Sequence, residues 1–293
     1  MTTPATKPTT VSLNIQSADN MAFEGAAIFL LGSPKTGKTV LACTASAYAP
    51  SPLMPTTRTS LPDVLVLQFE PNGTSSALHM GLAPQVLDFA ATEYLVNSDS
   101  DKVSNDGLLD WNKVRPALVA TAQYVRSKPE IKIIVIDNLS AFTDMVVAHE
   151  ESLQSLQKKD GYLAYANAKR ASEWLLNLFR KEKKLIIGIA HTKAADVTDP
   201  AKVEARAASG QLAPQVPGLP AGTASVWQKA SDAVIHTRCK SEKIVVGGEP
   251  QIRPSYRLMV TSSNKMAGGN RWGLSGERES HLGPIVKRFY PNL

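Results

Sequence analysis

The segment GSPKTGKT at residues 32–39 constrains the fold of this chain more than any other feature. It matches the pattern G-x-x-x-x-G-K-[ST], and it stands between an apolar run at 26–31 and a helical stretch at 39–48. Gly32 and Gly37 let the backbone bend around an anion, and the following N–H groups and helix end then point toward it. Because the strand and the helix are both present, the segment predicts a phosphate-binding loop in an α/β fold.

The loop also predicts a ligand and the residues that hold it. We expect Lys38 to reach the β- and γ-oxygens of a nucleoside triphosphate and Thr39 to ligate Mg²⁺ through its hydroxyl. The other residues expected to line the phosphates are Gly32, Ser33, Pro34, Lys35, Thr36, Gly37 and Val40. The guanine-reading NKxD pattern has no match, since the nearest string, at 264–267, ends in Ala267. We therefore expect the ligand to be ATP with Mg²⁺.

Apolar runs and helical patterns alternate along the middle of the chain. The runs are almost wholly apolar, as in strands covered on both faces, and they fall at 26–31, 63–69, 131–136 and 185–190. Helical spacing connects Val114 to Val125 behind a candidate N-cap, Asp110, and Ala164 to Leu178 in a second stripe. This order predicts a mainly parallel central sheet with right-handed crossovers and helices on both faces.

The pattern changes after Ala190. Residues 192–222 have little periodicity and read as a long loop, of a length that is usually functional or disordered. A short helix near 223–230 and a strand near 233–238 follow. A C-terminal antiparallel hairpin, with strands near 243–246 and 256–261, is expected to complete the sheet.

Composition divides the chain into one domain with two tails. Residues 1–20 are rich in Thr, Pro, Ser and Asn, and we expect them to be flexible. We expect residues 21–275 to form the ATPase domain and residues 276–293 to form a basic tail. The net charge is +6, and residues 238–293 hold ten Lys and Arg against four Asp and Glu, so the excess lies there. Such asymmetry indicates either a polyanionic partner or a solvated basic edge.

Several classes of protein are excluded. Two cysteines, Cys43 and Cys239, cannot form a disulfide framework or a paired zinc site. The first residues lack the apolar core of a signal peptide, and no run approaches the roughly 20 apolar residues of a membrane span. We therefore expect a cytoplasmic protein, the host cytoplasm if a phage encodes it, with no membrane contact.

Three polar residues follow predicted parallel strands, so we expect them at the same edge of the sheet. Ligands of open α/β sheets bind at this edge, where the strands end. Asp137 follows IKIIVI and suits the metal, although strand-end Asp residues also serve as caps. Glu70 suits the activation of a water molecule, or it is a surface acid before a turn. His191 suits a sensor of γ-phosphate, or it is a structural histidine.

The order of these motifs resembles the RecA-like branch of P-loop ATPases. More narrowly, it resembles the small phage RecA-like recombinases of the Sak-type single-strand annealing group, over about residues 23–275. The resemblance implies a single RecA-like core with Lys38 and Thr39 at the phosphates and Mg²⁺, Glu70 as the catalytic acid, Asp137 as the metal acid and His191 as the sensor. RecA usually has Gln at the sensor position.

The same resemblance implies DNA-contacting loops and self-association. The loops fall, by order along the chain, at about 155–162 and 192–222, where Lys158, Lys159 and Tyr162 offer phosphate and stacking contacts. Lys265 and Arg271, on a glycine-containing loop, are candidates to touch the nucleotide of a neighbouring subunit. Arg271 is the one assigned a catalytic role.

The leading hypothesis is a Mg²⁺-dependent ATPase that assembles into a ring or filament on single-stranded DNA and promotes annealing or strand exchange in phage recombination. A single-strand-binding protein is a possible further partner. A hexameric motor of the replicative-helicase type is the first alternative. The second is an ATP-switched module that binds a protein partner and no DNA.

Overall fold

The computed structural model describes most of the chain. The described residues are 25–51, 53, 57–96, 109–155, 162–194, 215–246, 249–259, 269–270, 277–279 and 281–290. The expected N-terminal tail, 1–20, lies outside them.

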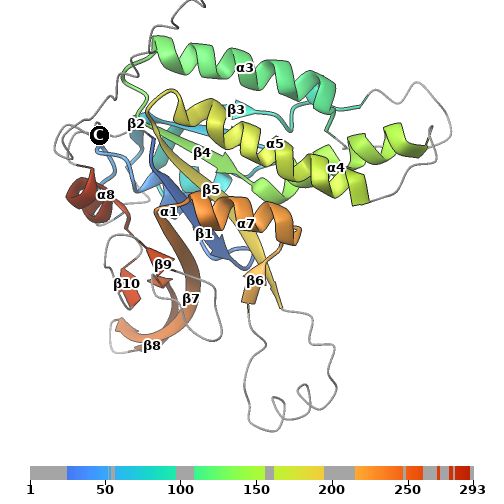
Figure 1. The fold of residues 1–293 in the computed structure, drawn as a ribbon. Helices are drawn as coiled ribbons and strands as arrows, with labels where there is room; N and C mark the ends of the chain where they lie inside the picture. The colour runs from blue at the N-terminus through green and yellow to red at the C-terminus, as the bar shows by residue number, and fades with distance from the viewer. Residues whose placement is uncertain are drawn as a thin grey trace, which may run out of the picture.

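A single large sheet forms the centre of the molecule (Figure 1). Its parallel strands are β1 (Ala27–Gly32), β2 (Thr59–Gln68), β3 (Leu82–Asp88), β4 (Ile133–Asp137), β5 (Leu185–Ala194) and β7 (Ala233–Val246). Its antiparallel strands are β6 (Gln215–Pro217), β8 (Glu249–Met259), β9 (Gly269–Asn270) and β10 (Glu277–Glu279). The order across the sheet is β10-β8-β7-β1-β5-β4-β2-β3, so the loop-bearing strand β1 lies in the interior.

Helices cover both faces of this sheet. They are α1 (Lys38–Cys43), α2 (Ser75–His79), α3 (Trp111–Ser127), α4 (Leu139–Ser155), α5 (Tyr162–Arg180), α7 (Ala221–Ala230) and α8 (Gly283–Phe289), with a 3₁₀ turn at Thr92–Tyr94. One core lies between the sheet and α3, α4, α5 and α7, and the other between the sheet and α1, α2 and α8. The expected fold class, a mainly parallel α/β sheet of the P-loop NTPase type, is confirmed.

The apolar runs explain why the central strands take these positions. Successive residues of β1 enter opposite cores: Phe29 and Leu31 pack with α7, and Ile28 and Leu30 pack with α1. All six residues of β1 are buried. A strand with only apolar side chains therefore fits only in the middle of a sheet that is covered on both sides.

The helix α3 begins and packs as its sequence predicts. The carboxylate of Asp110 accepts a hydrogen bond from the N–H of Asn112 at 2.9 Å, and this caps the helix. Val114, Leu118 and Val125 are fully buried on the face that meets the sheet. In α5 the predicted stripe is likewise buried from Ala164 to Leu175, whereas Leu178 is half-buried.

The C-terminal part differs from expectation in two places. Residues 276–293 are not simply a tail, because 277–279 pair with β8 and α8 packs on the core through Leu282, Ile285 and Val286. Those three positions have the spacing of one helical turn, and this apolar pattern outweighs the surrounding positive charge. The N–H of Leu282 also donates to the Thr44 hydroxyl at 2.9 Å.

The region after Ala190 is also more regular than expected. β5 continues to Ala194 and pairs with β6, and α7 begins at Ala221, so only 195–214 of the expected loop lie outside the described residues. The predicted strands near 233–238 and 243–246 form one strand, β7, which pairs antiparallel with β8. The C-terminal hairpin is therefore confirmed with longer strands. None of the described helices has the length and apolar character needed to traverse a lipid bilayer.

Candidate nucleotide site

The loop between β1 and α1 adopts an anion-binding conformation. Gly37 has φ 74° and Lys35 has φ 63°, both in the left-handed region, which Gly occupies without the steric cost of a Cβ. A Cβ at Gly32 would lie 2.1 Å from the Thr237 hydroxyl oxygen and 2.6 Å from that of Thr36. Glycine at 32 is therefore required by close approach, and glycine at 37 by backbone conformation.

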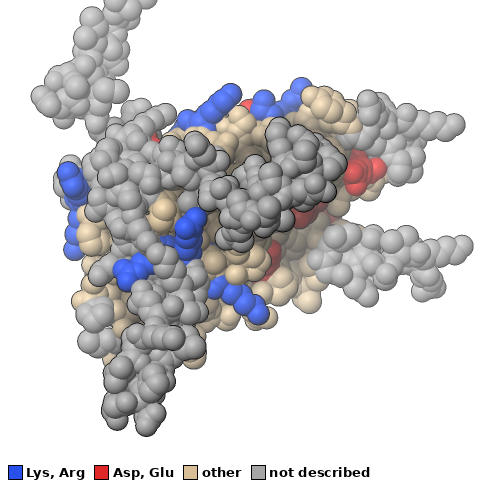
Figure 2. All heavy atoms as spheres, turned by 90° about the horizontal axis from the view of Figure 1, so that it is seen from below, with Lys and Arg blue, Asp and Glu red and all other residues tan. Residues whose placement is uncertain are grey.

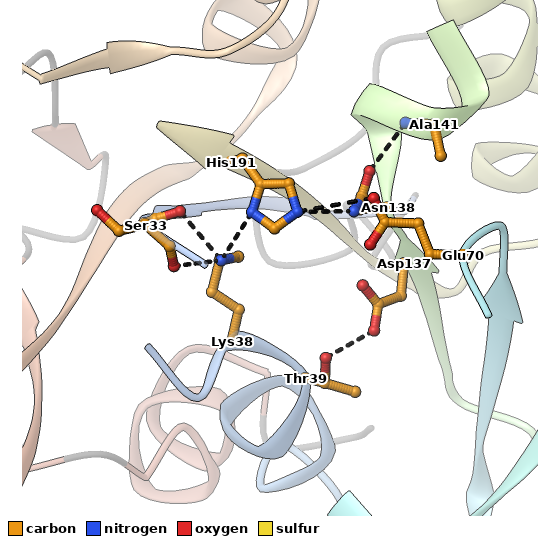
Figure 3. A network of polar contacts seen from close by, with 9 residues as sticks. Ser33, Lys38, Thr39, Glu70, Asp137, Asn138, Ala141 and His191 are labelled. Atoms are coloured by element: carbon orange, nitrogen blue, oxygen red, sulfur yellow. Dashed lines mark hydrogen bonds and ion pairs between the residues drawn. The ribbon is translucent and has the colours of Figure 1, made fainter. Parts of the chain in front are cut away.

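Strand register brings the polar residues of four segments to this loop. Gly32 on β1 pairs with His191 on β5, and Gln68 on β2 pairs with Asp137 on β4. Since all four strands are parallel, these residues share the edge of the sheet at which the strands end. The arrangement predicted for Lys38, Glu70, Asp137 and His191 is therefore the one observed, as Figure 3 shows.

The amine of Lys38 is surrounded by acceptors at the start of the loop. Its Nζ donates to the carbonyl oxygens of Gly32 at 3.0 Å and Ser33 at 2.8 Å, and it lies 3.3 Å from Nδ1 of His191. Burial lowers the pKa of Lys38 to about 8, and the nearby carboxylates of Asp137 and Glu70 oppose that shift. A bound anion would add further counter-charge beside this buried amine.

Thr39 and Asp137 form a direct contact opposite the lysine. The Thr39 hydroxyl donates to Oδ2 of Asp137 at 2.6 Å, and the Asp137 side chain is almost fully buried. Burial raises the pKa of Asp137, and the negative charge of Glu70 raises it further. The hydrogen bond from Thr39 acts in the opposite direction. A carboxylate and a hydroxyl oxygen held together in this way form part of a ligand set that suits Mg²⁺.

His191 connects the lysine to Glu70 and Asn138. Its Nε2 lies 3.1 Å from Nδ2 of Asn138 and 3.7 Å from Oε1 of Glu70 (Figure 3). The hydrogen bond with His191 lowers the pKa of Glu70, and burial opposes that shift. A hydrogen bond with Asn138 and the positive charge of Lys38 lower this pKa further. A neutral imidazole has one acceptor nitrogen, so Lys38 and Asn138 cannot both donate to it at once. The ring therefore has two alternative hydrogen-bonding states.

These groups enclose one pocket of about 290 Å³. Its lining residues are Lys35, Thr36, Gly37, Lys38, Thr39, Glu70, Asn72, Gly73, Ser75, Ser76, Asp137, Asn138 and His191. Polar and charged groups dominate the lining, and it contains no Phe, Tyr or Trp side chain. The pocket is suited to phosphate groups rather than to a nucleobase.

Not every predicted residue lines this pocket. Gly32 and Ser33 act through their carbonyl oxygens, Pro34 is exposed, and Val40 packs on the core below α1. Tyr162 is 80% exposed at the start of α5 and is not part of the pocket. The predicted residues Lys158, Lys159, Lys265 and Arg271 lie outside the described residues.

The sequence analysis missed several residues that shape the pocket. Asn138 follows Asp137 directly, and its Oδ1 accepts from the N–H of Ala141 at 2.9 Å, which holds its amide toward His191. Gln68 accepts from the N–H and hydroxyl of Thr74, at 2.8 and 2.9 Å, and so fixes the turn that carries Glu70. Only Asn138 had a usable signal, its place next to a strand-end acid.

Thr237, on the neighbouring strand β7, is a further residue without a sequence signal. Its hydroxyl oxygen lies 2.6 Å from that of Thr36, and it is buried behind the loop. The Thr36 hydroxyl also donates to the carbonyl of Ser33 at 2.8 Å. β7 therefore supports the phosphate-binding loop from the side opposite His191.

Comparison with known proteins agrees with this geometry. A family model described as an AAA domain matches residues 24–272, which is most of the chain and includes every residue of the pocket. A search of curated proteins gave no match. The matched region begins before β1 and extends past β9, so it includes the parallel strands and the helices α1 to α7. The chain therefore belongs to the AAA domain family of P-loop ATPases.

Proposed function

We propose that this protein is a cytoplasmic, Mg²⁺-dependent ATPase of the RecA-like type that binds single-stranded DNA and promotes annealing or strand exchange in phage recombination. The observation that carries the ATPase part is the convergence of Lys38, Thr39, Glu70, Asp137 and His191 on one pocket. The DNA part depends on the resemblance to Sak-type recombinases and on surface chemistry near the pocket.

The pocket residues fit a nucleoside triphosphate with Mg²⁺. Lys38 is buried beside carbonyl oxygens that phosphate oxygens can replace, and Thr39 and Asp137 are already in contact. When bound, Mg²⁺ would neutralise charge that develops on the phosphate oxygens. Thr39 and Asp137 would hold the ion, and Lys38 would hold the β- and γ-phosphates.

Glu70 is the residue that we assign to the attacking water. Its lowered pKa keeps it ionised at neutral pH, and it is half-buried at the rim of the pocket. An ionised carboxylate in this position can accept a proton from water, or orient the water toward a phosphate. His191 contacts both Glu70 and Lys38. If Lys38 moved onto a phosphate, the imidazole of His191 would lose its contact with the lysine amine.

We assign His191 the role of sensor for that change. It lies near the end of β5, and its carbonyl oxygen accepts from the N–H of Gly218 at 2.7 Å, just after β6. The two strands flank residues 195–214, which the resemblance assigns to a DNA-contacting loop. A change at the imidazole would therefore act close to the base of that loop.

Exposed aromatic side chains support the DNA part of the proposal. Tyr162 and Tyr165, on the first turn of α5, are 80% and 48% exposed. Tyr165 also lines a mostly apolar groove with Lys193 and Gln228. Aromatic rings next to cations are typical of surfaces that stack single-stranded bases. Lys158 and Lys159 would add phosphate contacts, and Arg271 would act on the nucleotide of a neighbouring copy in a ring or filament.

A second candidate function, an ATP-switched module that binds a protein, is favoured by a different surface. A groove of about 390 Å³ lies between β3 and α3 and is lined by Val86, Leu87, Tyr94 and Tyr124, among others. Val86 and Tyr124 are each more than two-fifths exposed. Apolar exposure of this kind is typical of protein contacts.

The test is the rate of ATP hydrolysis with and without single-stranded DNA, with Lys38→Ala as the blank. We expect DNA to raise the turnover of the wild type and the annealing of complementary oligonucleotides to depend on the protein. Turnover without any response to DNA, together with no DNA binding, would favour the protein-binding module. Displacement of a strand from a forked duplex would favour the helicase-type motor instead.

A further inference from the structure

The imidazole of His191 lies between two side chains that can only donate hydrogen bonds to it. Nζ of Lys38 is 3.3 Å from Nδ1, and Nδ2 of Asn138 is 3.1 Å from Nε2 (Figure 3). Lys38 has a pKa of about 8, so at pH 7 its amine is protonated and has no acceptor. A neutral imidazole has one N–H and one bare nitrogen, so only one of the two groups can donate to it at a time. In either tautomer, the second nitrogen directs its own N–H at a donor.

The amide of Asn138 is held in the orientation that creates this competition. Its Oδ1 accepts from the N–H of Ala141, in the first turn of α4, at 2.9 Å. The side chain of Asn138 is 1% exposed, so the amide is out of contact with bulk water. A rotation of the amide by half a turn would break the bond to Ala141 and turn the NH₂ group toward the N–H of Ala141, which has no acceptor. Nδ2 therefore stays directed at the ring.

Glu70 gives this competition a consequence for the proposed chemistry. Its Oε1 lies 3.7 Å from Nε2 of His191, the same nitrogen that the Asn138 amide approaches. When Nε2 carries the proton, its N–H attracts the carboxylate of Glu70. When Nε2 is bare, it accepts from Asn138 and offers the carboxylate no donor. The tautomer of His191 therefore decides whether Glu70 is held by the ring or is available to a water molecule.

The two tautomers differ in their need for Lys38. In the first, the Lys38 ammonium donates a charge-assisted hydrogen bond to Nδ1, and Nε2–H faces Glu70. If Lys38 leaves Nδ1 for a phosphate oxygen, only Asn138 remains of the two donors. Nε2 then gives its proton to water and accepts from Asn138, while Nδ1 takes up a proton from water. The ring stays neutral throughout, and the exchange changes only which nitrogen carries the hydrogen.

We propose that Asn138 is a positioning residue that competes with Lys38 for the single acceptor nitrogen of His191. When Lys38 engages a phosphate, Asn138 captures the ring and Glu70 is released. This inference rests on the ATPase part of the proposed function and names how that site is regulated. In the empty pocket, His191 holds Glu70. Glu70 therefore becomes available to the attacking water only after Lys38 has moved onto the nucleotide.

The surface charge of the molecule supplies one control for this exchange. Figure 2 shows Lys and Arg side chains of the described residues mainly on the left of the face seen from below, and Asp and Glu side chains mainly on the right. Salt screens the fields of such exposed charges, whereas the contacts of His191 are short and partly buried. A rise in KCl concentration should therefore leave the tautomer of His191 unchanged.

The experiment records this tautomer by NMR in protein labelled with ¹⁵N at histidine. A bare nitrogen and an N–H nitrogen have well separated ¹⁵N shifts, and a His191→Gln variant assigns the signal. Spectra are taken at pH 7 with and without a non-hydrolysable ATP analogue and Mg²⁺. The test variant is Asn138→Ser, because serine can still accept from the N–H of Ala141 as an N-cap but lacks the amide that donates to the ring.

Asn167→Ser, on α5, is the matched control. Nδ2 of Asn167 likewise donates to a side chain, Oε2 of Glu150 at 2.7 Å, and its Oδ1 accepts from Arg170 at 3.2 Å. In the wild type and the control, we expect the proton of His191 on Nε2 without the analogue and on Nδ1 with it. In Asn138→Ser, we expect the proton to stay on Nε2 in both samples. Turnover of ATP by this variant should fall roughly tenfold with little change in KM, because it loses a hydrogen bond that forms only in the loaded pocket.

The outcomes separate this inference from the proposed function. A wild type that binds the analogue in calorimetric titration but keeps the proton on Nε2 would overturn the exchange and leave the ATPase in place. The wild-type spectra decide this point even if Asn138→Ser does not fold. A wild type that binds no analogue would overturn both. A proton that also moves to Nδ1 in Asn138→Ser, or a control that behaves like Asn138→Ser, would remove Asn138 from the competition. A doubly protonated ring, or a change of tautomer produced by KCl alone, would reject the exchange.

Discussion

The nucleotide pocket and the β7–β8 ribbon place charge in opposite ways. In the pocket, Lys38 lies near Asp137 and Glu70, and Thr39 donates to Asp137, so each charged group has an opposing or hydrogen-bonding partner. In the ribbon formed by β7 and β8, the register places Arg238 on the same rung as Arg257. The pocket therefore combines buried charges of both signs, whereas this rung of the ribbon places two positive residues opposite each other at the surface.

The comparison indicates how each region should respond to its ligand. A buried and compensated site exchanges internal contacts for contacts with phosphate, so its affinity depends on protonation and geometry. An exposed cationic face gains mainly from the release of counterions, so its affinity depends on salt. Nucleotide binding should therefore follow pH, and DNA binding should follow ionic strength. Four predictions test this difference.

The largest effect is expected from Glu70→Gln in the pocket. The amide keeps the size of the side chain but cannot accept a proton from water, so turnover should fall by about 100-fold or more while ATP affinity is retained. Steady-state ATPase assays and nucleotide titration measure the two quantities. Asp88→Asn is the matched control, since Asp88 ends the neighbouring strand β3 and is not part of the pocket lining. A Glu70→Gln protein with full turnover would remove Glu70 from the chemistry.

The sequence was sufficient for the five pocket residues to which a chemical role is assigned, because they follow a simple geometric rule. The loop motif fixed the position of Lys38 and Thr39, and parallel strands that end at one edge brought Glu70, Asp137 and His191 to the same place. The four buried strands were recognisable because both of their faces are covered. The edge strand β3 was not, since it contains Pro84 and its side chains are only partly buried.

Contacts between segments distant in the sequence could not be predicted in the same way. The pairing of Thr36 with Thr237 joins residues 201 positions apart, and neither belongs to a pattern that indicates the other. The opposition of Arg238 and Arg257 requires the exact register of a hairpin, which one residue of slippage would change. α8 was missed because its apolar residues are few and lie among charged ones.

The next largest effect concerns pH. The pKa of Lys38 is lowered to about 8 without nucleotide, and bound phosphate would raise it because an anion favours the charged amine. Below pH 8 the amine is protonated in both states, so affinity should be constant. Above pH 8 binding must take up a proton, so Kd should rise by up to about tenfold for each pH unit.

Titration with a non-hydrolysable ATP analogue at pH 7, 8 and 9 measures this dependence. Binding of single-stranded DNA over the same range is the internal comparison, since arginine does not titrate there. We expect the two ligands to diverge between pH 8 and 9. Nucleotide affinity that is the same at pH 8 and pH 9 would contradict the burial argument for Lys38.

A smaller effect, on stability, is expected from Asp137→Asn. The carboxylate is buried and its pKa is raised, so the ionised form destabilises the pocket in the absence of a cation. The amide can still accept the hydrogen bond from Thr39. We expect an increase in stability of about 1 kcal/mol, seen as a rise of roughly 2–4 °C in the thermal midpoint, with loss of Mg²⁺-dependent nucleotide binding. An unchanged or lower midpoint without Mg²⁺ would show that the charge is already compensated.

The smallest effect is expected from Thr237→Val, at the point where the pocket and the ribbon meet. Valine keeps the shape of threonine but removes the hydroxyl that contacts Thr36, so the loop should hold phosphate about threefold more weakly. Thr121→Val is the control, because the Thr121 hydroxyl is likewise buried and hydrogen-bonded, donating to the carbonyl of Ala117 at 2.7 Å, but it lies on α3. Both variants should lose similar stability, and only Thr237→Val should lose nucleotide affinity. If single-stranded DNA tightens nucleotide binding equally in the wild type and in Thr237→Val, the hydroxyl pair supports the loop but does not carry the coupling between DNA and nucleotide.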